Sequence, residues 1–166
     1  MKEAFDKISS YNIFNYLFPG IIFVLFAKYF LGYDFIQSNE FIGAFLYYFI
    51  GMIISRFGSN VIDPILKKTK IFIFAEYKDF VFASTKDEKI EVLSEVNNTY
   101  RTIFSLIILL LILGFYNYLE TLLSIPKQLS LFLFLIMLVL LFFFSYRKQT
   151  MYITKRIKII CNSKTN

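Results

Sequence analysis

Long apolar runs separated by charged segments dominate the pattern of residues along this chain. Four of them approach the roughly 20 residues that an α-helix, rising about 1.5 Å per residue, needs to cross a bilayer core. They occupy residues 11–31, 41–55 with a weaker continuation to 62, 102–118 and 129–146. The pattern predicts an all-α protein, an integral membrane four-helix bundle with a cytoplasmic helical extension between spans 2 and 3.

The basic residues predict which side of the membrane each connection faces, because Lys and Arg beside a span are retained in the cytoplasm. The connection at 56–101 carries eight of them and the tail after Tyr146 carries six, whereas 32–40 carries none. Both termini and the middle segment are therefore expected to be cytoplasmic. The expected parts are a first transmembrane helix pair (1–62), a cytoplasmic segment (63–101), a second transmembrane pair (102–146) and a basic cytoplasmic tail (147–166).

Composition narrows the chemistry open to the protein. The 166 residues are 57% hydrophobic and 18% charged, include no His, and have Cys161 as the only cysteine. His-based acid and base catalysis, His/Cys metal sites and paired-thiol chemistry are therefore excluded. No glycine-rich phosphate loop, nucleophile elbow or zinc spacing occurs. We expect no enzymatic activity, with no catalytic, cofactor-binding or metal-binding residues.

The middle segment begins with a pattern typical of a helix start. Asp63 and Pro64 predict an N-cap and a first-turn proline, so that the second span kinks and a helix restarts over 65–70. The aromatic-rich residues 71–83 that follow predict a loop or a short extended piece.

A second helix start is predicted at Thr85, which with Glu88 has the spacing of a capping box. Neither Gly nor Pro follows until Gly114, so a helix of roughly 33 residues is expected to run directly into the third span. Its cytoplasmic half carries a stripe of residues at helical spacing that needs a packing partner: Ile90, Leu93, Asn97 and Tyr100.

Five aromatic residues fall within eleven positions of the middle segment: Phe72, Phe74, Tyr77, Phe80 and Phe82. Left exposed, they would form an apolar patch large enough to dock a soluble partner. Packed on the following helix, or placed at the lipid interface as an aromatic belt, they would be structural. The sequence favours the structural interpretation without excluding docking.

Small residues recur along one side of the second helix at spacings of seven, four and three. They are Ala44, Gly51, Ser55 and Gly58. Small side chains let helix backbones approach closely in lipid. The contact could lie within one chain or between copies of it.

Polar groups in or beside the spans need a partner or access to water. Arg56 is expected either to extend to the inner interface or to pair with Asp63 or Glu95, and Lys28 to extend to the outer interface.

Asn12 and Asn15 share a helix face just before Pro19. The sequence favours a short interfacial helix over residues 11–18, with the span itself starting at Pro19. The alternative is a polar lining or a hydrogen-bonded pair between helices.

The tail after residue 146 interleaves basic and apolar side chains. Such a pattern beside a membrane predicts attraction to anionic lipid headgroups rather than to nucleic acid, which would require more charge and a recognisable binding fold. The expected partners are therefore the lipid bilayer, further copies of the chain and a cytoplasmic protein, with no direct nucleic-acid contact.

Two resemblances bear on function. Residues 83–102, which end in Asn-Asn-Thr-Tyr-Arg-Thr, resemble part of small bacterial membrane proteins. In span number, size and orientation the whole chain resembles the membrane subunit of the Kiwa anti-phage system. That resemblance implies a homo-oligomer of the bacterial inner membrane that senses phage attack and holds a cytoplasmic partner.

These observations predict a non-enzymatic inner-membrane sensor or scaffold that recruits a cytoplasmic partner through residues 67–101. The resemblance to the Kiwa subunit implies that it serves anti-phage defence. The alternative is an oligomeric pore-forming or membrane-disrupting effector whose second helix lines a channel. A transporter is less favoured, because no charged pair lies at mid-depth in the spans.

Overall fold

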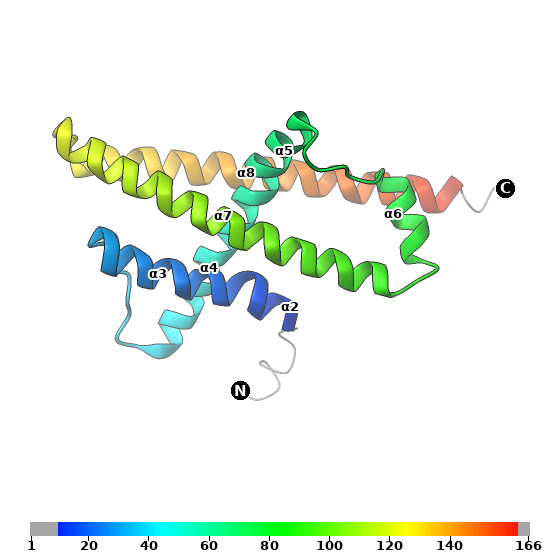
Figure 1. Ribbon diagram of the computed structural model, residues 1–166, viewed down its shortest axis with the longest axis horizontal. Coiled ribbons are helices and arrows are strands. Elements are labelled where there is room, and N and C mark those ends of the chain that lie inside the picture. The colour runs from blue at the N-terminus through cyan, green and yellow to red at the C-terminus, as the bar shows by residue number, and fades with distance from the viewer. Residues whose placement is uncertain (1–9, 163–166) are drawn as a thin grey trace.

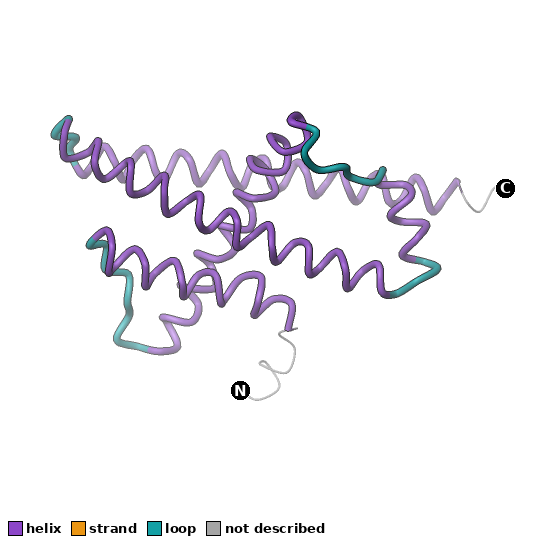
Figure 2. The backbone as a smooth tube through the Cα atoms, in the orientation of Figure 1, coloured by secondary structure: helices purple, strands orange, loops and turns teal. Residues whose placement is uncertain are grey.

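A computed structural model describes residues 10–162 of the chain, and these residues are all helical or in connecting loops (Figures 1 and 2). In chain order the elements are α2 (Ser10–Asn12), η1 (Ile13–Leu17), α3 (Phe18–Leu31), α4 (Glu40–Phe57), η2 (Gly58–Ile62), α5 (Asp63–Thr69), α6 (Tyr77–Ser84), α7 (Lys89–Leu122) and α8 (Lys127–Asn162). The two η elements are single π-helical turns.

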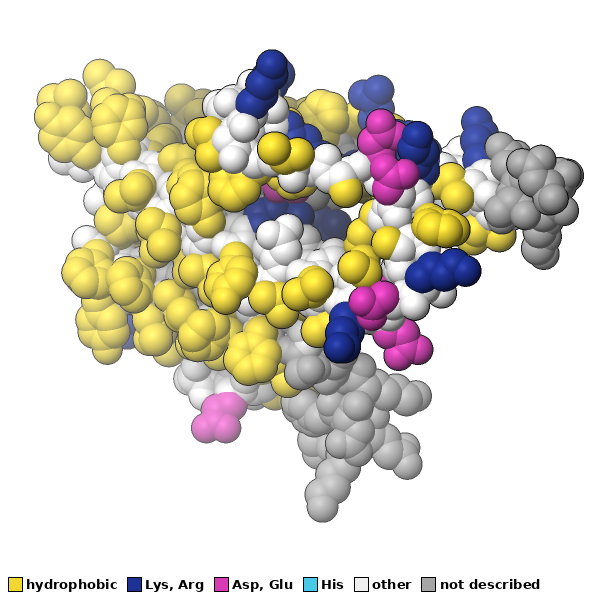
Figure 3. Space-filling model, turned by 45° about the vertical axis from the view of Figure 1, so that its right-hand side comes forward, with side chains coloured by type: hydrophobic (Ala, Val, Ile, Leu, Met, Phe, Trp, Pro, Cys, Tyr) yellow, Lys and Arg dark blue, Asp and Glu magenta, His cyan; other side chains and the backbone are white. Residues whose placement is uncertain are grey.

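Four continuous helices are long and apolar enough to cross a membrane. They cover Ile13–Leu31, Glu40–Thr69, Lys89–Leu122 and Lys127–Cys161. Apolar side chains cover much of the outer surface (Figure 3), as a lipid-facing bundle requires. The all-helical class and the four long apolar helices are thus confirmed.

The helices run so that the two short connections, residues 32–39 and 123–126, lie at the same end of the molecule (Figure 1). We call this the loop end. We call the opposite end, which carries residues 56–101 and 147–162, the basic end. Helix α4 crosses the others obliquely and contacts α3, α7 and α8, so it is the centre of the bundle.

The second span does not restart at Asp63 as predicted. Asp63 has helical backbone angles, φ −54° and ψ −47°, and its N–H bonds to the carbonyl of Gly58, so α4, η2 and α5 form one continuous helix. A proline normally clashes with the carbonyl four residues before it. The wider π turn immediately before Asp63-Pro64 relieves that clash, so no break or side-chain cap is needed.

The first span repeats this arrangement. The turn η1 ends one residue before Phe18, which precedes Pro19, and the Phe18 N–H bonds to the carbonyl of Ile13. The helix therefore continues from residue 10 to Leu31 and does not divide into an interfacial piece and a separate span. The sequence showed both prolines but not the π turns that accommodate them.

The middle segment differs from the prediction in two places. Residues 71–76 form a loop, but residues from Tyr77 onward form the helix α6. The start of α7 is capped by Asp87, whose carboxylate accepts from the Lys89 N–H at 2.9 Å, and not by Thr85. The Thr85 hydroxyl bonds instead to the carbonyl of Phe82 and closes α6.

The uninterrupted helix that follows is confirmed, with α7 extending over 34 residues into the third apolar run. Helix α8 has 36 residues and packs least closely. Only 6% of its most apolar 18-residue stretch is buried inside the structure, against 28% for the corresponding stretch of each of the first two spans. Its position therefore depends on a few specific contacts, described below.

The predicted small-residue face forms contacts within the chain. A Cβ on Gly51 would overlap the backbone of Tyr16, and one on Gly20 would overlap the backbone of Tyr47, so the first two spans meet backbone to backbone. Gly58 faces the Ser105 hydroxyl of α7 in the same way. Ala44 is only half-buried and adds little.

We predict that Gly51→Ala lowers the free energy of unfolding by about 2 kcal/mol or more, because the added methyl group forces the first two spans apart. Gly114→Ala is the matched control, since its Cβ would lie 3.4 Å from Leu31 Cδ2, an ordinary contact. Alanine's higher helix propensity should leave that variant as stable as the wild type or slightly more so. Equal thermal unfolding of the two variants in detergent would contradict the close approach.

Candidate functional site

A line of polar side chains follows one side of the central helix toward the basic end and meets polar groups from the other helices. We call this set the polar seam. Its members are Asn15, Ser55, Ser59, Asn60, Asp63, Arg101, Thr102, Ser145 and Lys148.

The innermost part of the seam joins the first three spans. Asn15 Nδ2 donates to Ser55 Oγ at 3.3 Å, and the Thr102 hydroxyl lies 2.7 Å from Asn15 Oδ1 and 3.2 Å from Ser55 Oγ. All three side chains are buried. An amide is costly in apolar surroundings unless it is hydrogen-bonded. Of the two interpretations of Asn15, the structure therefore shows the interhelical hydrogen bond.

The next level holds an ion pair between α5 and α7. Arg101 Nη1 donates to Asp63 Oδ2 at 3.1 Å, and the two side chains are only 20% and 15% exposed. Arg101 Nε is buried without a hydrogen-bond partner among residues 10–162. The sequence had named Asp63 as a candidate partner for Arg56. Arg56 is half-buried and forms no ion pair with Asp63 or Glu95 within the described part of the chain.

Helix α8 is held to the central helix by two polar contacts. Lys148 Nζ donates to Ser59, at its backbone carbonyl and at Oγ, the latter at 2.7 Å. Asn60 Nδ2 donates to Ser145 Oγ at 2.7 Å. Because Ser59 and Asn60 are adjacent and both lie in η2, the π turn provides both of these polar contacts with α8.

Positive charge exceeds negative charge around this attachment. The ammonium of Lys148 is attracted electrostatically by one carboxylate, Asp63, and repelled by Arg101, Lys67 and Arg56. Lys148 is thus influenced by one carboxylate and three cations, of which Lys67 is exposed and has its Nζ 4.6 Å from the centre of the Phe74 ring. Figure 3 shows basic side chains in a hollow on one face of the molecule, behind a rim of neutral and apolar groups.

A separate polar network lies at the loop end, where sequence analysis had predicted none. Ser130 Oγ donates to Glu120 Oε1 at 2.6 Å, Tyr116 donates to Ser130 at 2.7 Å, and Tyr33 donates to Asn117 at 3.2 Å. Burial and the nearby Glu120 charge raise the pKa of the Tyr33 phenol. These contacts connect the third and fourth spans to the first connection.

Lys28 also extends to the loop end, as expected, and its Nζ lies 3.0 Å from Asp34. The hydrogen bond from Lys28 holds the pKa of the Asp34 carboxyl below its usual range. Both groups are well exposed, so this pair contributes little to stability.

The five aromatic residues predicted as a docking surface separate into two groups. Tyr77 and Phe80 are half-buried, and the Tyr77 ring lies 5.1 Å from that of Tyr152 on α8. Phe72, Phe74 and Phe82 are exposed. Packing within the chain therefore accounts for part of the cluster only.

The predicted stripe on α7 is likewise not covered within the chain. Ile90 is half-buried near α6, but Leu93, Asn97 and Tyr100 are exposed. The stripe and the exposed aromatic residues leave apolar surface uncovered on two elements of the basic end.

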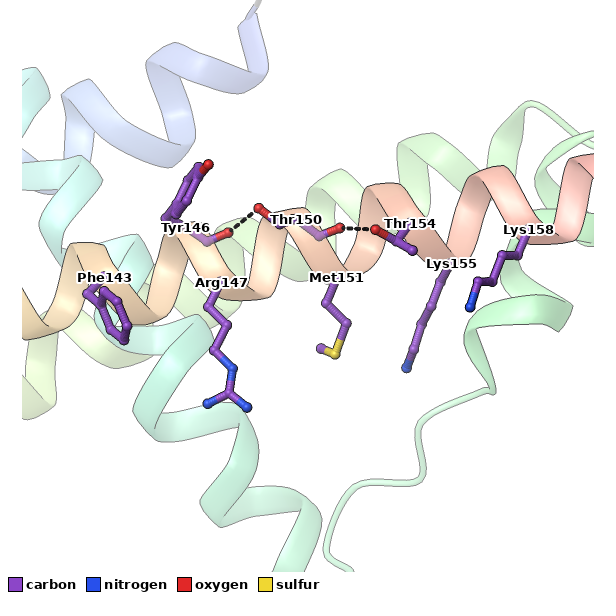
Figure 4. Close-up of a pocket in the computed structure, with 8 residues that line it drawn as sticks. All are labelled: Phe143, Tyr146, Arg147, Thr150, Met151, Thr154, Lys155 and Lys158. Atoms are coloured by element: carbon purple, nitrogen blue, oxygen red, sulfur yellow. Dashed lines mark hydrogen bonds between the residues drawn. The ribbon is translucent and has the colours of Figure 1, made fainter.

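An open groove of about 550 Å³ runs along one side of α8 (Figure 4). Arg147, Met151 and Lys155 point to the same side of the helix, toward α5 and the loop that follows it. The full lining consists of Phe143, Tyr146, Arg147, Thr150, Met151, Thr154, Lys155 and Lys158. Part of the predicted mixture of basic and apolar groups on the tail, namely Arg147, Met151, Lys155 and Lys158, therefore lines one groove.

Comparison with family models, with curated proteins and with solved structures returns no match. The candidate site must therefore be interpreted from its own chemistry. That chemistry consists of hydrogen bonds between helices, the partly buried Asp63–Arg101 ion pair with an Arg101 Nε that has no partner within the described residues, and surplus positive charge, which suit binding and helix attachment.

We predict that Thr102→Val destabilises the protein by roughly 1 kcal/mol, because Asn15 Oδ1 loses its closest donor in an apolar setting. A double-mutant cycle with Asn15→Leu should give a coupling of similar size. Thr121→Val is the control, since Thr121 is exposed and bonds only to the carbonyl of Asn117 on its own helix. Additive effects of Thr102→Val and Asn15→Leu on chemical unfolding would refute the interhelical bond.

Proposed function

We propose that this protein is a non-enzymatic scaffold or sensor of a bacterial inner membrane, whose basic end faces the cytoplasm and recruits a soluble protein. The observation that carries the proposal is the length of the last two helices. With 34 and 36 residues, α7 and α8 are each about 50 Å long, whereas a bilayer core is about 30 Å thick. About 20 Å of each helix therefore lies outside the apolar core.

These extensions form a structured surface together with α6, which contacts both α7 and α8 (Figure 1). We call this surface the platform: the loop 70–76, α6, residues 89–100 of α7 and residues 147–162 of α8. Tyr77 connects it to α8 through its ring contact with Tyr152 and a hydrogen bond to the Tyr152 carbonyl. A binding surface positioned in this way keeps a fixed relation to the membrane spans.

The charge distribution supports a cytoplasmic platform. Residues 56–101 and the tail hold most of the Lys and Arg of the chain, and the short connections of the loop end, residues 32–39 and 123–126, hold none. Retention of positive charge in the cytoplasm then sets the orientation.

Exposed apolar side chains make the platform suited to a protein partner. The loop carries four consecutive apolar residues, of which Ile73 is 98% exposed, and Phe82 and Leu93 are exposed nearby. Apolar surface of this kind on the water side of a membrane protein marks a docking site. The resemblance to the Kiwa membrane subunit extends the proposal to anti-phage defence, with the platform holding the cytoplasmic partner.

The small-residue face of the second helix is occupied by contacts within the chain, and this favours a scaffold over a pore. Gly51, Ser55 and Gly58 pack against other spans of the same chain, so this face of the second helix is not free to line a channel. Assembly of several copies would have to use other surfaces, of which α8 offers the largest apolar one.

We predict that a photo-reactive amino acid placed at Ile73 or Phe82 in living cells forms an adduct of one discrete mass with a soluble protein. Phe82→Ser combined with Phe72→Ser should reduce recovery of that protein at least about tenfold, since two exposed aromatic anchors are lost. The matched control is Phe35→Ser, which removes an exposed aromatic side chain at the loop end. Unchanged recovery would reject the docking surface, and ion flux from the purified protein in liposomes would favour the pore.

A further inference from the structure

The surplus of positive charge at the attachment of α8 is not explained by the scaffold function. The groups concerned are contributed by α4, η2, α5, α7 and α8, and we call them the recess: Arg56, Ser59, Asp63, Lys67, Arg101 and Lys148. Within it, Asp63 is the only carboxylate. The hydrogen bond from Arg101 Nη1 partly neutralises the charge of this carboxylate.

The recess retains donor capacity that its own residues do not use. Arg101 can offer five N–H donors in a fork that matches a carboxylate or a phosphate. One bond to Asp63 is made, and the buried Nε has no partner within residues 10–162. Lys148 donates to Ser59 and is repelled by Arg101 and Arg56, both partly buried, and by the exposed Lys67. Like charges brought together under partial burial repel strongly unless an anion compensates them.

The position of the recess along the helices indicates where that anion comes from. Arg56 directly follows the second apolar run, Arg101 directly precedes the third, and Lys148 lies four residues after Phe144, the end of the polar-free stretch of the fourth. All three cations therefore lie where the apolar core of a bilayer gives way to headgroups. Basic pockets between spans at this level are suited to lipid phosphates.

We propose that the recess binds the phosphate group of an anionic phospholipid at the inner leaflet, with Arg56, Arg101 and Lys148 as its cationic contacts. Asp63 keeps Arg101 oriented, and Ser59 keeps Lys148 oriented, so these two cations are held in place before the lipid arrives. The bound phosphate would complete the charge balance that joins α5, α7 and α8. The inference depends on the proposed orientation but not on recruitment of a protein partner.

The test uses the full-length protein in nanodiscs of three kinds: zwitterionic lipid alone, zwitterionic lipid with phosphatidylglycerol or cardiolipin, and zwitterionic lipid with added inorganic phosphate. Thermal unfolding is measured in each, and native mass spectrometry detects retained lipid. We expect the anionic lipid to raise the unfolding temperature of the wild type and to be retained. Arg56→Gln and Lys148→Gln should each need at least about ten times more anionic lipid than the wild type for the same rise in unfolding temperature, because each removes a charge-assisted contact.

Two comparisons separate lipid binding from a structural role. Lys68→Gln, which removes an exposed cation from the same helix as Lys67, should respond to anionic lipid as the wild type does. Arg56 forms no ion pair among the described residues, so Arg56→Gln should unfold at the wild-type temperature or higher in zwitterionic lipid, where it relieves repulsion. The proposal would be overturned if Arg56→Gln lowered the unfolding temperature by the same amount in all three kinds of nanodisc.

The remaining outcomes are also decisive. Stabilisation by inorganic phosphate equal to that by lipid would retain the phosphate chemistry but reject lipid as its source. Absence of any stabilisation, or equal lipid retention by wild type, Arg56→Gln and Lys148→Gln, would reject the site. The orientation is checked separately with Cys161, which is exposed and should react with a membrane-impermeant maleimide in inverted vesicles but not in intact cells.

Discussion

Polar groups enclosed in an apolar bundle have to satisfy one another, and at the basic end of this protein most of them do so along the central helix. In lipid no water is present to replace a missing partner. The continuous helix α4–η2–α5 presents Ser55, Ser59, Asn60 and Asp63 to neighbours on three other helices. The register of the bundle at the basic end follows from these contacts, because sliding any one helix would leave a buried donor or acceptor unpaired.

The two π turns make this arrangement geometrically possible. A regular helix spaces its side chains by 100°, so Ser55, Ser59 and Asp63 would fall close to one face. The wider turn of η2 directs Ser59 and Asn60 to α8 while Asp63 meets α7. Single π turns inside α-helices are often found at functional positions. Here η2 contacts α8 and lies beside the partly buried ion pair of Asp63 and Arg101 and the surplus positive charge.

Connection of the platform to the membrane spans follows from the same contacts. Helix α8 packs loosely over its apolar length, so Lys148, Ser145 and the Tyr77–Tyr152 contact determine where its extension lies. Binding of an anion in the recess would act on this attachment and therefore on the platform. Under the proposed function, this small group of charges would couple a lipid-derived signal to the cytoplasmic partner.

Local properties of the chain were predictable from the sequence, and properties that depend on contacts between helices were not. The four apolar helices follow from hydropathy, and the length of α7 follows from the absence of Gly and Pro before Gly114. Asp63-Pro64 and Thr85 were misleading for different reasons: the Asp63 carboxylate binds Arg101 across the bundle, whereas the Thr85 hydroxyl bonds locally to the Phe82 carbonyl and closes α6. The role of Asn15 became evident only once Ser55 and Thr102 were placed beside it.

The interaction between α5 and α7 can be tested directly by exchanging its two charges. Asp63→Arg and Arg101→Asp should each destabilise the protein in nanodiscs, because each leaves two like charges together in a partly buried position. The double exchange should restore most of the unfolding temperature, since the pair is re-formed with opposite polarity. A double variant no more stable than either single one, or single variants as stable as the wild type, would contradict the polar seam as the structure that holds the basic end together.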